Sequence, residues 1–226
     1  MRLIRGMVVA AVSVVSIPLA EEVNADPAFS TKYSYYKISG ESAPELYLSM
    51  LRRGPHVQGE KAYAATSAES SQRGRLEIAA KSCRIADYQY SVEFTIRLPR
   101  LADESALSAN ARGRWRQFSN FLRKHEETHR SIWMGCANEI EAKIRNLRGR
   151  TCEEVDARAQ RIRDAVQASC NRKHVAFDTA EQMRLAKHPF VKLVLGPLYN
   201  PIKPTSRATT VVAKKRKKST VTLMNW

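Results

Sequence analysis

Acidic residues, long apolar runs and closely spaced cysteines are all scarce in this sequence of 226 residues. Only 22 Asp and Glu stand against 38 Lys and Arg, which gives a formal net charge of +16. No Cys-x-x-Cys pair is present, which argues against a zinc site built of cysteines. The apolar run at residues 7–19 is too short and too early for a stable membrane span. With 43% hydrophobic and 27% charged residues, the rest of the chain is sufficient for one domain with a hydrophobic core.

The first 25 residues have the pattern of a secretory signal peptide. Arg2 and Arg5 form a positively charged start, the apolar run follows, and Val23-Asn24-Ala25 offers small residues for cleavage after Ala25. The alternative is an uncleaved membrane anchor, against which the short apolar run argues. We therefore expect a mature protein that is secreted or periplasmic and has no transmembrane segment.

The excess of positive charge belongs to the mature chain. Residues 1–25 contain two basic and two acidic residues, so their removal leaves the charge at +16. Such a balance favours anionic partners, and export makes cell-envelope polymers and lipid headgroups better candidates than nucleic acid. The alternative is a solvated basic surface without a specific partner.

The motif His-Glu-x-x-His at residues 125–129 carries the most specific chemical signal. On a helix, His125 and His129 lie on one face, one turn apart, and can direct two imidazole nitrogens at one zinc ion. Glu126 lies one step round the helix, where its carboxylate can act as general base toward a water at the metal.

The flanks of the motif predict one long helix. Apolar residues recur at steps of three and four, the period of one helix face, and both histidines lie in this stripe. The members are Trp115, Phe118, Leu122, Ile132, Cys136, Ile140, Ile144 and Leu147. The alternative is a pair of core histidines that flank a glutamate by chance, and we favour the zinc site.

Before this helix, the pattern predicts a small antiparallel sheet. Residues 32–38 alternate and are rich in tyrosine, residues 41–53 have a helical pattern, and residues 60–67 are a further candidate strand. Two more strands are expected within residues 73–100, with a turn near residues 82–87.

After it, a second helix is expected. Residues 148–150 form a turn, and Thr151-Cys152-Glu153-Glu154 has the arrangement of a capping box. An apolar pattern then continues to about Ser169, and a short turn makes the two helices antiparallel neighbours. The predicted fold class is α+β, with a small antiparallel sheet packed on a zincin-like helical hairpin.

Zinc requires a third protein ligand, and the hairpin offers two. With the turn centred near Gly149, His125 lies opposite about Lys173. His174 therefore arrives at the level of the metal and is our first candidate, and Asp178, one turn further, is the second. The alternative for His174 is an exposed histidine beside Lys173.

Four cysteines suit an oxidising compartment and allow two disulfides. If residues 152–170 form one helix, Cys152 and Cys170 lie about 27 Å apart and cannot be bonded to each other. Cys83 is then left to pair with Cys136, Cys152 or Cys170, and this choice stays open.

The last part of the chain differs from the rest. Residues 214–218 are a run of lysines and one arginine within a Ser/Thr-rich segment, and prolines interrupt the region before it. We predict a domain at residues 26–198 and a basic, disordered tail at residues 199–226. The tail could hold the protein to an anionic surface, and the alternative is a solvated tail without a partner.

Several short segments together resemble one bacterial family. They are Tyr35-Tyr36-x-Ile38-Ser39-Gly40, Glu45-Leu46, Gly54-Pro55, Leu98-Pro99, Trp115-x-x-Phe118, the His-Glu-x-x-His motif and Phe177-Asp178. Over roughly residues 33–185, the chain is similar to the domain-of-unknown-function 922 family, whose members are described as candidate secreted zinc-dependent proteases. The resemblance implies an exported metallopeptidase-like domain with zinc. It implies no particular substrate.

This chain also departs from that family pattern. The family has a Thr three residues after the Asp and then a His-Gly, where this chain has Glu181, Met183 and Arg184. If the family histidine is a ligand or proton donor, then His174, Asp178 or Glu181 has to replace it.

The favoured function is hydrolysis of peptide bonds in a peptide or protein by a zinc-dependent peptidase. One alternative is an envelope-binding module that keeps the fold without turnover, which the basic charge and the missing histidine favour. The other is an amidase acting on cell-wall peptides with the same site.

Overall fold

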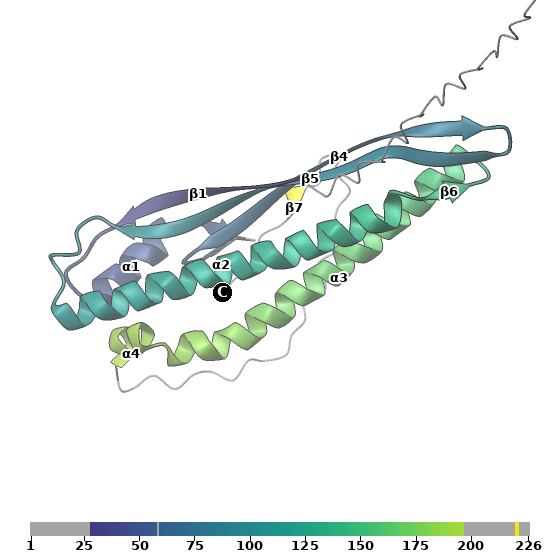
Figure 1. Cartoon of the computed structure of the whole chain (residues 1–226). Coiled ribbons are helices and arrows are strands. Elements are labelled where there is room, and N and C mark those ends of the chain that lie inside the picture. Colours follow the sequence, from purple (N-terminus) through teal and green to yellow (C-terminus); the bar gives the residue numbers. More distant parts are fainter. Residues whose placement is uncertain (1–27, 58, 197–219, 222–226) are drawn as a thin grey trace, which may run out of the picture.

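The computed structural model describes residues 28–57, 59–196 and 220–221 (Figure 1). The predicted signal peptide, residues 1–25, lies outside the described residues. So does the predicted tail, residues 199–226, apart from the two-residue strand β7 (Thr220–Val221).

One layer of the molecule is a mixed sheet with the strand order β1 (Ala28–Ile38), β5 (Ser82–Leu101), β4 (Ala65–Ala79) and β7. The short strand β6 (Arg148–Gly149) also pairs with β5. The α+β class is confirmed, but the prediction of a wholly antiparallel sheet is wrong in one pair. β1 runs parallel to β5, because the chain crosses over between β1 and β4 through residues 39–64.

The second of the two strands predicted within residues 73–100 is confirmed as β5, and its side chains alternate between the two faces of the sheet. Val92, Phe94, Ile96 and Leu98 are all buried, and they form the face of the sheet that packs on the long helix α2 (Ala109–Ile144). Alternate residues point to the same face of a strand, so this single run accounts for much of the contact between sheet and helix.

The hairpin of β4 and β5 turns at residues 80–81, and the predicted turn near residues 82–87 is wrong. The antiparallel ladder continues into the predicted turn, where Arg84 forms an ion pair of 2.6 Å with Glu77 across the strands. Ile78, placed by its alternation on a strand face, is 84% exposed. One face of this hairpin is therefore held by backbone and charge pairs, while Cys83 on the other face is buried in a core cluster with Leu147 and Val155.

Three short elements connect β1 to β4. Helix α1 (Ala43–Arg53) begins after the N-cap Ser42 and ends at Gly54, close to the predicted limits. The strands β2 (His56–Val57) and β3 (Glu60–Lys61) form a separate two-stranded pair. The candidate strand at 60–67 is thus divided between β3 and the start of β4.

Helix α2 confirms the long amphipathic helix that the apolar stripe predicts. Ser108 caps the N-terminus of this helix, where its hydroxyl accepts a hydrogen bond from the Ala111 N–H. The buried residues follow the predicted face. Two members of that stripe differ: Ile132 is only half-buried, and Leu147 is buried but lies beyond the end of the helix.

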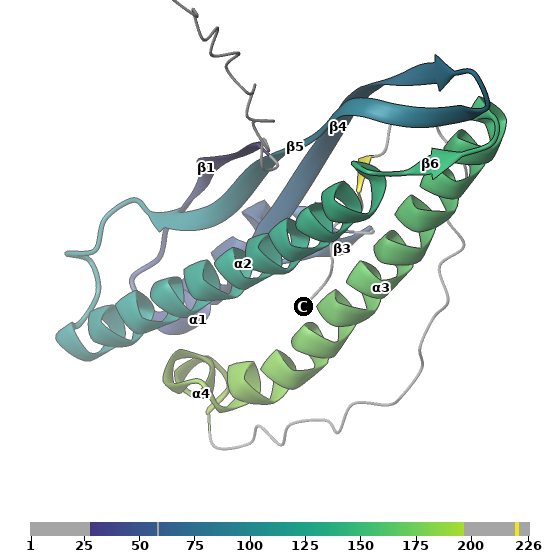
Figure 2. The same ribbon diagram turned by 45° about the vertical axis from the view of Figure 1, so that its right-hand side comes forward.

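A second helix of equal length, α3 (Cys152–Lys187), packs on α2 and is followed by α4 (Pro189–Leu195). The Thr151 hydroxyl accepts from the Glu154 N–H at the start of α3, as the capping box predicts. Figures 1 and 2 show α2 lying along the sheet and α3 alongside α2. The pattern had indicated helix to about Ser169, whereas α3 continues without interruption to Lys187.

Two disulfides join these layers. Cys83 of β5 is bonded to Cys152 at the start of α3, and Cys136 of α2 is bonded to Cys170 of α3. Two such bonds fit a protein of an oxidising compartment. Among the described helices, none has the length and hydropathy to cross a membrane.

Candidate metal centre

Helix α2 brings the two histidines of the motif together. His125 and His129 are buried, with 2% and 6% exposure, and their Nε2 atoms lie 2.8 Å apart. Residues four apart share a helix face, so the spacing in the sequence produces this convergence directly.

Helix α3 adds a carboxylate to the same point. The Asp178 Oδ1 atom lies 2.8 Å from His129 Nε2 and 3.4 Å from His125 Nε2. One ligand atom from each of these three buried residues lies within 4.8 Å of the others, so the group could hold a metal ion. Two imidazole nitrogens and one carboxylate oxygen are a donor set that can coordinate a divalent transition metal and leave a position open for water.

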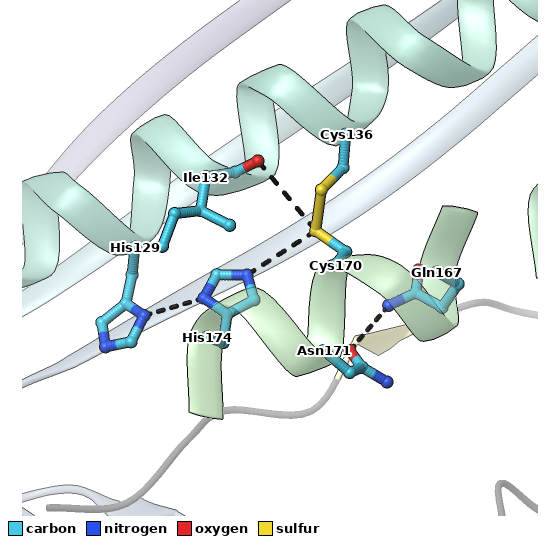
Figure 3. The surroundings of a disulfide bond; sticks show 7 residues. All are labelled: His129, Ile132, Cys136, Gln167, Cys170, Asn171 and His174. Atoms are coloured by element: carbon cyan, nitrogen blue, oxygen red, sulfur yellow. Dashed lines mark hydrogen bonds between the residues drawn. A yellow bond between two sulfur atoms is a disulfide. The ribbon is translucent and has the colours of Figure 1, made fainter. Parts of the chain in front are cut away.

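His174 lies beside this group but on the other nitrogen of His129. Its Nδ1 atom is 2.8 Å from His129 Nδ1, and the two rings share a hydrogen bond whose direction depends on their tautomers. The His174 Nε2 atom lies 3.8 Å from the Cys170 sulfur (Figure 3). The first-ranked candidate ligand thus contacts a motif histidine, and the second-ranked candidate, Asp178, lies among the converging ligand atoms.

The disulfide between α2 and α3 holds the register that produces this arrangement. His129 lies two helical turns before Cys136, and Asp178 lies two turns after Cys170, so an antiparallel pair bonded at the cysteines brings both residues to one level. The predicted hairpin was displaced from this register by about two turns, because pairing Cys136 with Cys170 moves every facing residue of α3 about eight positions later than predicted. The reason is that the connection contains β6, so α3 begins beyond the end of α2 (Figure 1).

Glu126 is buried on a different side of α2, facing the sheet. The Thr66 hydroxyl of β4 donates to Glu126 Oε2 at 2.8 Å and lies 3.1 Å from the Glu126 carbonyl oxygen. Thr66 had not been identified from the sequence. No local motif marks it, because its relation to Glu126 depends on how β4 packs against α2.

Aromatic rings enclose the histidines. Phe177 stacks on His125, with 4.7 Å between the ring centroids, and meets His129 edge-on at 5.1 Å. The ring centroids of Trp133 and His174 lie 4.9 Å apart. These contacts restrict the rotation of the imidazoles and limit the access of water to them.

The protonation states in this environment suit metal binding. Burial lowers the pKa of His125 to about 4 and that of His174 to about 4. Burial pushes the pKa of Asp178 upward, but hydrogen bonds from His125 and His129 outweigh it, and the net pKa is below the ordinary value. Neutral imidazoles and an ionised carboxylate are the forms that coordinate a metal.

A cleft of about 540 Å³ opens beside His125, between α2 and the end of α3. Its walls combine aromatic and basic side chains with one carboxylate. The lining includes Phe121, Lys124, Phe177, Glu181, Arg184 and Lys187.

Two other acidic residues of α3, Glu181 and Glu154, are not part of the group of converging ligand atoms. Glu181 is buried in the cleft wall and forms an ion pair with Arg184 at 2.9 Å. Glu154 is at the start of α3, where its carboxylate accepts from the Arg150 N–H. Its role in capping agrees with the expectation from the sequence.

Comparison with known proteins places the chain in a family without assigned chemistry. The model of a family described as "Bacterial protein of unknown function (DUF922)" matches residues 33–186, which is more than half of the chain. No curated protein and no solved structure matches.

Proposed function

The chain belongs to the DUF922 family, and we propose that it is a secreted or periplasmic zinc-dependent peptidase that hydrolyses peptide bonds. The single observation that carries this proposal is the convergence of His125, His129 and Asp178 beside an open cleft. A buried carboxylate, Glu126, lies on the same helix and next to one of these histidines.

Zinc is the metal that the donor set favours. Imidazole nitrogen is a ligand of borderline softness, and its combination with one carboxylate is typical of catalytic zinc rather than of calcium or magnesium, which prefer oxygen ligands. In this proposal His125 and His129 each contribute Nε2, and Asp178 contributes Oδ1.

We assign His174 a positioning role rather than a place in the coordination sphere. Histidine ligands usually engage their second ring nitrogen in a hydrogen bond, which fixes the tautomer and the ring orientation. The 2.8 Å contact between the Nδ1 atoms of His174 and His129 is of this kind. His174 would then accept the Nδ1 proton of His129 and leave the Nε2 lone pair for the metal.

A bound zinc ion would supply Lewis-acid activation of water and of the substrate carbonyl. Glu126 would take a proton from the attacking water and later deliver it to the leaving amine. Thr66 would hold the Glu126 carboxylate in place through its 2.8 Å hydrogen bond. Across the reaction, one water is added to the C–N bond, and the products are one carboxylic acid and one amine.

Export is supported by two observations. The described chain contains two disulfides, which persist in an oxidising compartment, and the first 25 residues have the pattern of a cleaved signal peptide.

A second candidate function is an envelope-binding module without turnover. Met183 and Arg184 stand where the family resemblance expects a His-Gly, and the net charge of +16 suits anionic polymers. An amidase of cell-wall peptides would use the same residues as the peptidase and differ only in its substrate.

The decisive experiment compares two adjacent carboxylates. Glu126→Gln should retain one zinc per chain and lose hydrolysis of a dye-labelled protein substrate by at least about 100-fold, because the general base is absent. Glu127→Gln is the matched control, since Glu127 is a neighbouring carboxylate that accepts from the Tyr33 hydroxyl. Full activity of Glu126→Gln would refute the assignment, and bound zinc without any hydrolysis by the wild type would favour the second candidate.

A further inference from the structure

The cleft beside His125 carries an excess of positive charge. Lys124, Arg184 and Lys187 contribute three cations, and Glu181 contributes the one acidic side chain in the lining. Glu181 is already paired with Arg184 at 2.9 Å. Within the described part of the chain, neither lysine has a carboxylate at ion-pair distance, so two cations of the lining are available to a ligand.

Lys124 and Lys187 are exposed at the rim of a cleft whose walls are partly apolar. Phe121 and Phe177 line the same cleft, and burial lowers the pKa of the neighbouring His188. The attraction of the two lysines for an anion therefore acts through solvent and is weakened by salt.

The two lysines lie at different distances from the proposed metal. Lys124 directly precedes His125 on α2. Lys187 is nine residues after Asp178, which is about 13 Å along α3. An extended peptide advances about 3.3 Å per residue, so an anionic group near Lys187 would lie roughly two to four residues from the bond at the metal.

We infer that this cleft binds a carboxylate of the substrate, and that the protein acts on acidic peptides. The inference rests on the proposed function, because it treats the cleft as the substrate site of the metal centre. The carboxylate has two sources, an acidic side chain or the carboxyl terminus of the peptide, and the cleft chemistry is the same for both. Lys124 and Lys187 are therefore specificity-determining residues.

The test measures binding separately from hydrolysis. Three peptides of equal length are titrated into the Glu126→Gln protein, both with zinc and after zinc removal. The first has an internal Glu and an amidated carboxyl end, and the second has an internal Gln and the same amidated end. The third has an internal Gln and a free carboxyl terminus. We expect the Glu peptide to bind about 5-fold more tightly than the amidated Gln peptide at low salt. The difference should shrink as salt is added. Tighter binding of the third peptide instead would identify the carboxyl terminus as the source.

Variants that remove the charge of the two lysines then test whether these residues cause the preference for the Glu peptide. Lys124→Gln combined with Lys187→Gln should reduce the preference to less than about 2-fold. The matched control is Lys37→Gln combined with Lys81→Gln, which removes the same charge from two exposed lysines of β1 and of the hairpin turn and should leave the preference intact. Equal binding of all three peptides, or an equal loss of preference in both double variants, would overturn the inference. A charge preference in a protein that hydrolyses nothing would refute the peptidase proposal and retain the binding site.

Discussion

The bond between Cys136 and Cys170 connects the fold to the proposed metal centre, and the second disulfide provides a control for the effect of its removal. The Cys136–Cys170 bond closes a loop of 34 residues, and the bond between Cys83 and Cys152 closes one of 69. Loop-closure entropy then assigns about 4 kcal/mol of unfolding free energy to either bond, because this entropy grows only slowly with loop length. The two double Cys→Ala variants should therefore lose similar stability.

Their effects on zinc should differ. The Cys170 sulfur lies 3.8 Å from His174 Nε2, and the same bond holds His129 and Asp178 at one level. Its loss allows α2 and α3 to shift, and we expect zinc affinity to fall by about 10-fold, as when the outer partner of a metal ligand is removed. The other bond ends at Cys152, roughly 40 Å along α3 from Asp178, so its loss should change zinc affinity by less than about 2-fold.

Two assays separate these effects. Urea unfolding of the metal-free proteins gives the loss of stability, and competition with a chromophoric chelator gives the zinc affinity of each variant under conditions where it is folded. Equal losses of zinc affinity in the two variants would refute the reasoning, because the effect would then follow global stability alone. An unchanged affinity after loss of the Cys136–Cys170 bond would refute it as well.

Three further predictions concern single side chains. Thr66→Val removes the hydroxyl that holds Glu126, so kcat/KM should fall about 10-fold while zinc affinity stays within about 2-fold, which steady-state kinetics and zinc titration can check. Phe177→Leu removes the ring that stacks on His125, and zinc affinity in the same titration should fall about 3-fold with little change in unfolding free energy. Burial holds the pKa of His188 below its ordinary value, so its contribution to stability is present above the unfolded pKa of about 6.5 and is lost as the pH falls below it. His188→Asn keeps an acceptor for the start of α4 without this titration, and urea unfolding at pH 7 and pH 5 should show a weaker dependence on pH than in the wild type.

Helices were the most predictable part of this fold. The apolar stripe of α2 has the period of 3.6 residues, and the Thr151 cap marks the start of α3, so local sequence was sufficient for these two features. It was not sufficient for the second half of α3, which continues from Ser169 to Lys187. The sheet was harder to predict, because alternation in β1 and β5 indicates two strands without revealing whether the two strands run parallel or antiparallel. The hairpin turn was misplaced because charge pairs across the strands, which have no periodic signature, continue the ladder.

The candidate site shows the same division between local and distant information. His125 and His129 were recognisable because four residues on a helix are one turn, whatever the rest of the chain does. The level at which α3 meets them depended on β6 and on a disulfide, and neither follows from spacing alone. For this reason the sequence identified both His174 and Asp178 as candidate ligands. Which of them lies among the ligand atoms could be decided only from the structure. Thr66 had no sequence signal at all, because only the packing of the sheet on α2 brings it to Glu126.

The central claim is that His125, His129 and Asp178 share one metal ion while His174 stands outside it, and zinc stoichiometry of purified variants tests this most directly. The wild type should bind one zinc per chain. Alanine at any of the three proposed ligands should abolish stoichiometric binding, whereas His174→Ala should keep one zinc with an affinity about 10- to 100-fold weaker. One tightly bound zinc in Asp178→Ala, together with none in His174→Ala, would contradict the account and exchange the roles of these two residues.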